Sequence, residues 1–412
     1  MGNARSTKAS KTKSTAKAKK STAKYEGKTR KEAPTSLAEV LSRADEPATE
    51  PVPAEIAAKL SEHRVVVSST DAYFDPRKQW SRLAGSKTGW ELATREPITA
   101  GLPITRIERL EPEPLARARG ALREISPYRP PWQPLVHQPK RALIEKPVRT
   151  LRRRNGAKVE PLTVFNHDDR EIFLPVGYPW HCIGKLSVTT ASGVRWNGTG
   201  SLVGKSTVIT AEHVVPWGDW GRGATILFQP GYFSPGLRML LGYGPAIGSW
   251  VTEAWGYVNA QKDGRLGIDL ATLRLERPMG EWLGNLGAKV YDDDWEDDPR
   301  WTLVGYPAVV GVSSTPSGLT STTIDGEFPT WQSGISVEDD DTDGSGLELE
   351  TYADATPGNS GGPLFGYWEK GPYAIGVMSS EERASTFSDG INIVAGGNAM
   401  LALIHRALSL WG

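Results

Sequence analysis

The sequence predicts a mainly β fold for residues 164–412, a barrel or a sandwich that ends in one helix. Short runs of apolar and β-branched residues recur there between turn-forming residues, which is typical of many short strands. These runs lie at 184–188, 201–203, 207–210, 271–275 and 301–304. Residues 398–410 differ, because their leucines and isoleucine follow helical spacing and predict an amphipathic helix.

The chain before this β-rich part has another composition and divides into two segments. Residues 1–34 hold nine lysines among serine, threonine and alanine, so little can be buried and a disordered tail is expected. Residues 35–163 are rich in proline, with helical patterns at 54–65 and 115–125, and predict a partly ordered pro-region or linker. The run Arg152-Arg153-Arg154 indicates either a processing site or a solvated loop.

The lysine-rich tail is expected to be an interaction segment. A run of like charge usually stays solvated and contacts anionic partners, here anionic lipid, nucleic acid or a nuclear-import receptor. Residues 1–6 also fit the N-myristoylation pattern with Gly2 as acceptor, and a basic stretch is the usual second membrane signal. A chance match to so short a pattern is the alternative, and metabolic labelling with a myristate analogue separates the two.

Composition excludes several classes of protein. The 412 residues carry 48 basic and 48 acidic side chains, so bulk charge does not indicate a polyanion binder. Cys182 is the only cysteine, which leaves no internal disulfide and no cysteine cluster for zinc; we expect no metal and no cofactor. We find no apolar run of about 20 residues and no apolar signal region. We therefore expect an intracellular or membrane-associated protein, with non-classical secretion left open.

The strongest candidate for chemistry is Ser360, in the turn Gly358-Asn359-Ser360-Gly361-Gly362. Small residues let the backbone bend tightly and leave the serine hydroxyl accessible. The same bend can aim the amides of Gly358 and Ser360 at one point, as an oxyanion hole requires. A glycine-rich hairpin turn with an idle serine is the alternative reading of this segment alone.

A serine nucleophile needs a base, and the base needs a carboxylate to orient it. His213 follows the apolar run 207–210 and is expected on a rigid element, whereas His181, beside Cys182, better fits a core histidine. Asp269 precedes Leu270 and, as part of a strand, would share a face with apolar residues. A buried carboxylate must have a partner, and a catalytic histidine is a good candidate.

The order His213, Asp269, Ser360, with its flanking residues, resembles the chymotrypsin-fold serine proteases. Residues 210–213 resemble the histidine motif of that family, 268–271 its aspartate motif and 358–363 its serine motif. The similarity is strongest to the disulfide-poor, glutamyl endopeptidase-like branch, whose mature N-terminus the segment 164–170 also resembles. The resemblance implies two packed antiparallel six-stranded β-barrels with a C-terminal helix, in a protease domain of residues 164–412.

Several positions limit what the resemblance implies about regulation and specificity. Asn359 is neutral, so it cannot pair with a new N-terminal amine as the aspartate of animal zymogens does. Met378 stands where Glu-specific members have a histidine, so glutamate specificity is not supported. Asp354 matches the position that selects basic residues in trypsin-like members, a reading that we do not favour. Ser379 matches a serine that hydrogen-bonds the catalytic aspartate.

Thr356 and Ser380 are further candidates for a supporting or substrate-binding role, and the substrate should lie extended along residues 379–381. Residues 339–350 match a calcium-loop pattern, but their flanks read as two strands of a hairpin turning at Asp343-Gly344, so no calcium site is expected.

The sequence thus predicts a serine endopeptidase acting on polypeptides through an acyl-enzyme. Two rivals come from other classes of protein. One is a protease-fold binding module with little activity, localised by its basic tail. The other is a nucleic-acid-binding protein acting through residues 1–34, whose binding would depend strongly on salt.

Overall fold

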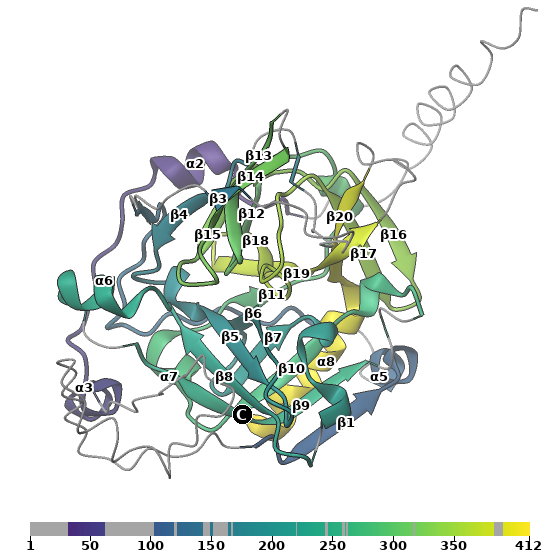
Figure 1. Cartoon of the computed structure of the whole chain (residues 1–412), viewed down its shortest axis with the longest axis horizontal. Coiled ribbons are helices and arrows are strands. Elements are labelled where there is room, and N and C mark those ends of the chain that lie inside the picture. The colour runs from purple at the N-terminus through teal and green to yellow at the C-terminus, as the bar shows by residue number, and fades with distance from the viewer. Residues whose placement is uncertain are drawn as a thin grey trace, which may run out of the picture. The chain divides into compact units, whose positions relative to one another are not determined.

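Strand pairing closes a six-stranded antiparallel barrel in the first half of the fold. In this computed structural model the strands follow the order β8-β5-β6-β7-β10-β9, and pairing between β9 and β8 closes the ring (Figure 1). The strands are β5 (Ile183–Thr189), β6 (Arg195–Leu202), β7 (Thr207–Thr210), β8 (Thr225–Pro230), β9 (Ser249–Tyr257) and β10 (Ala271–Leu275). The structure describes residues 32–61, 103–118, 122–142, 149–150, 164–165, 168–219, 221–243, 246–257, 260, 263–315, 318–382 and 390–412.

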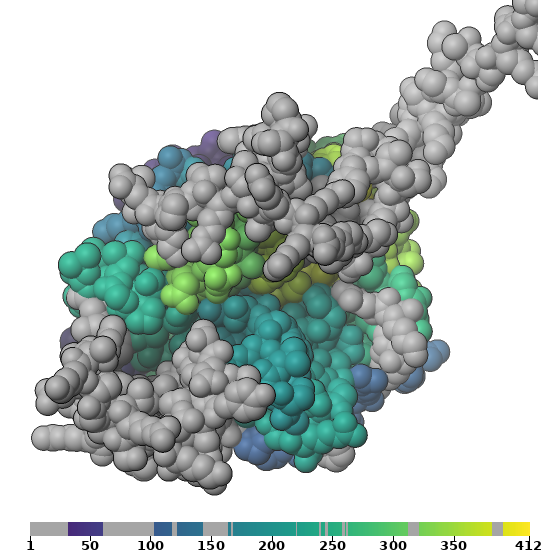
Figure 2. Space-filling view, in the orientation of Figure 1, coloured from purple at the N-terminus to yellow at the C-terminus, as the bar shows by residue number. Residues whose placement is uncertain are grey.

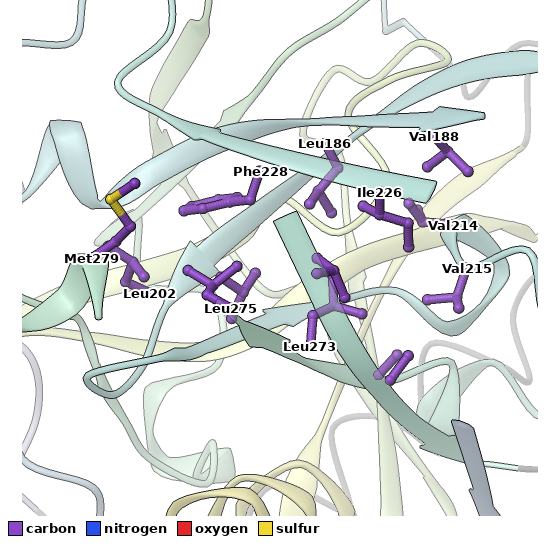
Figure 3. Close-up of a cluster of buried hydrophobic side chains, with 14 of the residues drawn as sticks. Leu186, Val188, Leu202, Val214, Val215, Ile226, Phe228, Leu273, Leu275 and Met279 are labelled. Carbon is purple, nitrogen blue, oxygen red and sulfur yellow. The ribbon is translucent and has the colours of Figure 1, made fainter. Parts of the chain in front are cut away.

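Alternate residues of these strands fill the barrel with aliphatic side chains (Figure 3). Leu186, Phe228 and Leu273 have no exposed surface, and Val214 from the turn after β7 packs with them. Each such side chain stabilises the fold by about 2 to 3 kcal/mol through burial. The turn that carries His213 is therefore anchored in the barrel core by its next residue.

The second half of the fold is a ten-stranded, mainly antiparallel sheet. Its path is β16-β17-β20-β19-β18-β12-β15-β4-β2, and β11 pairs with β19 in parallel. In Figure 2 the green and yellow-green surface of this half meets the teal surface of the first barrel. The strands are β2 (Lys140–Arg141), β4 (Glu171–Leu174), β11 (Gly287–Ala288), β12 (Trp301–Gly305), β15 (Thr330–Ile335), β16 (Asp339–Asp343), β17 (Gly346–Thr351), β18 (Pro363–Trp368), β19 (Gly371–Glu382) and β20 (Ile391–Gly396).

Six consecutive strands of this sheet, from β17 to β15, correspond to the second predicted barrel. Within the described residues no backbone ladder joins β15 to β17. Hydrogen bonds involving side chains bridge the gap instead: Thr351 Oγ1 donates to Ser336 O at 2.9 Å, and Asp354 N donates to Gln332 Oε1 at 2.7 Å. The second half therefore differs in detail from a closed barrel, because β4 takes one edge of β15.

Helix α8 (Gly397–Trp411) links the two halves. It packs on β7 and β10 of the first barrel and on β17 of the second sheet (Figure 1). Leu401, Leu403 and Ile404 are buried in a cluster that also holds Ile209 and Trp255. The helical spacing of residues 398–410 thus reflects a face that holds both halves of the fold.

Described parts of residues 35–163 belong to the same compact unit, which spans Pro34–Gly412. Strand β1 (Arg106–Leu110) adds to β9 in parallel, and one buried side chain enters each of the three main apolar clusters: Val40, Ile104 and Ile125. The helices are α2 (Leu37–Ser42), α3 (Ala54–Ser61) and α5 (Pro112–Ala118). The predicted helix at 115–125 is present up to Ala118 and is wrong at 122–125, because Ile125 pairs as a bridge with Ala288.

The remaining elements lie between the strands or at their edges. A small sheet joins β13 (Val309–Thr315), β14 (Gly318–Thr323) and β3 (Arg149–Thr150), and two short helices are α6 (Pro235–Leu240) and α7 (Met279–Leu283). A hairpin turns one residue later than predicted, at Gly344-Ser345, and its second strand is β17 as expected. Its first strand is β16, however, and not the predicted segment 334–337, of which residues 334 and 335 end β15. No helix among the described residues is long and apolar enough to span a membrane.

The predicted all-β fold class is confirmed, and β7 and β10 have the predicted bounds. The predictions for residues 1–31, with Gly2, and for Arg152-Arg153-Arg154 lie outside the described residues. The domain boundaries at 34 and 163 stay predictions.

A chain that begins at Val164 should unfold at a lower temperature than the full chain. Removing the upstream residues takes one buried side chain from each apolar cluster and leaves the β9 edge unpaired. Circular dichroism during heating measures the midpoint. An unchanged midpoint in a monomeric truncated protein would contradict the packing role of the described residues before Val164.

Candidate active site

His213 and Asp269 lie on two short 3-10 turns and contact each other through their side chains. His213 lies in the 3-10 turn Glu212–Val214, directly after β7. Its Nδ1 lies 2.7 Å from Asp269 Oδ2, and its backbone N–H donates to Asp269 Oδ1 at 3.0 Å. Because both carboxylate oxygens are used by one residue, the imidazole is held in a single orientation with Nε2 turned away from Asp269.

Asp269 is fully buried, as expected of a carboxylate with a partner. It lies two residues before β10, at the end of the 3-10 turn Leu266–Ile268, and not within the strand as predicted. Its amide bonds Leu266 O, so the turn and not the ladder sets its direction. Ser379 Oγ on β19 donates to Asp269 Oδ2 at 2.6 Å. The carboxylate is therefore held from both halves of the fold.

Ser360 lies in a turn that only glycine-rich sequence can form. Gly358 and Gly361 have φ of 102° and 82°, which side chains strongly disfavour. A Cβ on Gly361 would come within 2.1 Å of Thr210 Oγ1. Thr199 on β6 holds the turn, since its Oγ1 donates to Gly358 O at 2.7 Å and its N to Ser360 O at 2.8 Å.

These contacts bring the Ser360 turn against the residues on either side of His213. A Cβ on Gly361 would lie 3.0 Å from Ala211 N, and one on Gly198 would meet both the Val214 side chain and Ser360 O. No hydrogen bond joins the Ser360 hydroxyl to another described residue. Such a bond is often long in a protease without substrate and shortens in the complex.

The amides of Gly358 and Ser360 are the donors predicted for an oxyanion. The neighbouring amides of the turn are used: Asn359 N bonds Thr356 O, Gly361 N bonds Met378 O, and Gly362 N bonds Asn359 O. Among the described residues, neither the Gly358 nor the Ser360 amide has a hydrogen-bond partner. Two unused donors two residues apart are what a developing negative charge requires.

The charges of the His213–Asp269 pair support each other. Burial disfavours the imidazolium, but the Asp269 charge and hydrogen bond, with a contribution from Glu212, raise the pKa of His213 above 6.5. Burial would likewise raise the pKa of Asp269, but His213 and the Ser379 hydroxyl hold it below 3.8. The pair therefore stabilises the fold at intermediate pH, and loses this effect as Asp269 protonates or His213 deprotonates.

Glu212, which sequence reasoning did not single out, is a second carboxyl beside the pair. It is 6% exposed. Burial and then the Asp269 charge raise the pKa of Glu212 to about 7, against the attraction of Arg109 and His213. Its position next to a candidate histidine was visible in the sequence, but its burial was not.

Asp354 and Thr356 hold the chain that leads to Ser360. The Asp354 carboxylate accepts the backbone N–H groups of Phe165 and Asp169, each at 2.8 Å. Burial raises the pKa of Asp354 to about 6 against these two hydrogen bonds. Thr356 Oγ1 donates to Val309 O at 2.9 Å. The Asp354 carboxylate is thus occupied by the chain's own backbone.

Met378 and Ser380 lie on β19 beside the turn. The Met378 side chain is fully buried, and its N bonds Gly362 O at 2.8 Å. The ladder between β18 and β19 ends at Val377, whereas β20 stays paired with Ser380 and Glu381 on the other side. Among the residues that the structure describes, one edge of β19 is therefore unpaired from residue 379 onwards.

His181 lies apart from this site, as expected, with Nε2 at 2.7 Å from Leu283 O. Burial lowers the pKa of His181 to about 4. In the described part of the chain, the one group of three acidic side chains close enough to share a metal ion is Asp292, Asp293 and Asp294, none of which belongs to the site.

Arg170 and Asp168 are two further residues that sequence reasoning missed. Both are buried beneath the Ser360 turn, where Arg170 reaches Asn359. The only signal was their place in a segment similar to the mature N-terminus of the glutamyl endopeptidase-like branch, which says nothing of burial.

Comparisons with known proteins find similar chains among solved structures. No family model and no curated protein matches the sequence. Solved structures that match include the protease Anisep from Arthrobacter nicotinovorans, at 20% identity and a TM-score of 0.41, covering 58% of this chain and 99% of that one. A Glu endopeptidase in complex with MPD matches at 17%, with a TM-score of 0.44, covering 60% of this chain and 100% of that one.

A third match is the thermostable serine protease AL20 from an extremophilic microorganism, at 19% identity and a TM-score of 0.36, covering 56% of this chain and 98% of that one. With identities of 20% or less and TM-scores below 0.5, the likeness says nothing of this chain's function. The closed six-stranded barrel, the second antiparallel sheet and the C-terminal helix agree with the architecture that the sequence predicted, except that the second sheet does not close among the described residues.

Replacing Asp269 by asparagine should lower the pKa of His213. The substitution removes the charge that favours the imidazolium but keeps the burial that disfavours it. Titration of the histidine ring signals by NMR measures this change, and His181 provides a control signal that does not titrate near neutral pH. An unchanged pKa of His213 would contradict the described pair.

The Glu212→Gln variant should be more stable than the wild type above pH 7, and similar to it near pH 4.5. The folded state resists ionisation of Glu212, so the wild type loses stability as pH rises from 4.5 to about 7. The full difference is on the order of 3 kcal/mol. Urea unfolding at both pH values measures it, and equal stability at pH 8 would exclude a strained carboxylate.

Proposed function

We propose that this protein is a serine endopeptidase whose triad is His213, Asp269 and Ser360. The observation that carries the proposal is the doubly hydrogen-bonded Asp269–His213 pair beside a serine turn with two unused amides. Each feature alone occurs in proteins without activity. Together they supply a base, its orienting group and donors for the oxyanion.

The mechanism follows from these positions. His213 takes the proton of the Ser360 hydroxyl as its oxygen bonds to the peptide carbonyl carbon, and the carbonyl oxygen becomes an oxyanion held by the Gly358 and Ser360 amides. His213 then gives the proton to the leaving amine as the peptide bond breaks. Water hydrolyses the acyl-enzyme by the same steps. Asp269 stays ionised and stabilises the imidazolium.

The open edge of β19 supports an extended polypeptide as the substrate. Within the described residues no strand pairs with residues 379–381 on that side, so a peptide can add there as a further strand. A preference for basic residues is not supported, because the Asp354 carboxylate already accepts two backbone N–H groups. A preference for glutamate is not supported either, because Met378 stands where Glu-specific members have a histidine.

A fluorophosphonate probe should label the wild type and fail to label the Ser360→Ala variant. The matched control is Ser379→Ala, which loses the hydrogen bond to Asp269 but keeps the nucleophile, and should retain the label. Turnover of a peptide library should fall by a factor of about 10⁴ or more in Ser360→Ala.

Labelling that survives Ser360→Ala would assign the nucleophile elsewhere. A wild type that takes no label and cleaves no peptide would favour a protease-fold binding module.

A further inference from the structure

A buried ion pair lies beneath the Ser360 turn. Arg170 Nε donates to Asp168 Oδ1 at 2.8 Å and Nη2 to Asp168 Oδ2 at 2.7 Å, and each side chain is 1% exposed. Two charges removed from water require close geometry and further hydrogen bonds to be tolerated. The stability of the ion pair therefore depends on the residues that accept its further hydrogen bonds, and the positions of those residues depend on the pair.

The remaining bonds of Arg170 reach the residue next to the nucleophile. Nη1 donates to Asn359 Oδ1 at 3.0 Å and to Thr356 Oγ1 at 2.8 Å, and Nη2 donates to Val309 O at 3.2 Å. Asn359 Oδ1 also accepts Thr356 N at 3.1 Å. Asn359 is thus fixed by one guanidinium and one amide, and Ser360 follows it directly.

Residues near Arg170 in the sequence also hold Asp354, at the start of the loop 354–362 that carries Ser360. Phe165 N and Asp169 N both donate to the Asp354 carboxylate. We call Phe165, Asp168, Asp169 and Arg170 the anchor residues. They contact the loop at three places: Asp354, which lies six residues before Ser360, then Thr356, and Asn359, which directly precedes Ser360.

We propose that the anchor residues act as a built-in activation element, with Arg170 as the positioning residue that keeps the Ser360 turn in its oxyanion-binding conformation. The proposal rests on the proposed function. Because Asn359 is neutral, a hydrogen-bond donor is enough to hold it, and no free N-terminal amine is needed. Arg170 provides that donor from within the chain. Asp168 balances its charge. The turn is therefore formed without cleavage before Val164.

The first test removes the pair as a unit. Asp168→Leu combined with Arg170→Met leaves no unpaired buried charge, so the fold should be kept. If Arg170 positions the oxyanion donors, kcat per fluorophosphonate-titrated site should fall by about 10²-fold with little change in KM. Arg141→Met, which breaks an exposed ion pair with Glu171, is the matched control and should keep both constants.

The second test separates positioning from stability. Asn359→Asp keeps an acceptor for Arg170 and should retain kcat, whereas Asn359→Leu should lose it to the same extent as the double variant. Amide hydrogen exchange in residues 354–362 should rise in the double variant and stay unchanged in Arg141→Met. A double variant with lower stability but wild-type kcat per titrated site and unchanged exchange would overturn the proposal.

The third test concerns cleavage. Intact mass spectrometry of the labelled wild type should give the mass of the uncleaved chain plus one probe. Label found only on a chain that begins near Val164 would overturn the proposal. A wild type without any label would refute the proposed function, while the exchange measurement would still decide whether Arg170 holds the loop.

Discussion

The site depends on one physical constraint, a carboxylate with no access to water. Asp269 must receive hydrogen bonds wherever the chain places it, because an unpaired buried charge costs several kcal/mol. Its donors come from His213 after β7 and from Ser379 on β19, which belong to opposite halves of the fold. Satisfying Asp269 thus also aligns the two halves and sets the direction of the His213 ring.

The Ser360 turn meets a similar constraint through its backbone. Its positive φ angles need glycine, and its carbonyl groups are taken by Thr199 on the first barrel. The turn is consequently held by Thr199 of the first barrel and by Arg170, which bonds Asn359. Within the described residues the turn leaves two amides and one hydroxyl without a partner, and these are the groups that the proposed reaction would use.

The sequence predicts local features better than distant ones, for a physical reason. Strands 207–210 and 271–275 have the predicted bounds because their apolar and β-branched residues determine both secondary structure and burial. The candidate triad was found because each member lies beside such a strand or a glycine turn. Ile125 was assigned to a helix, since its pairing with Ala288 depends on tertiary structure that overrides local spacing.

The ion pair of Arg170 lay beyond prediction for the same reason. An arginine reads as exposed in any local pattern, and its partner Asn359 is far away in the sequence. Glu212 is similar: a glutamate usually lies exposed, and only the assembled fold shows that Glu212 is buried with Asp269 nearby.

The parallel pairing of β1 with β9 has a consequence for synthesis of the chain. Strand β1 leaves the ribosome before any strand of the first barrel, and its partner β9 appears only after four of them. During synthesis β1 therefore stays unpaired until β9 has been made. Strand β1 carries three charged side chains, those of Arg106, Glu108 and Arg109. Charge on an unpaired strand discourages pairing with other chains, so these residues protect β1 from aggregation until β9 is available.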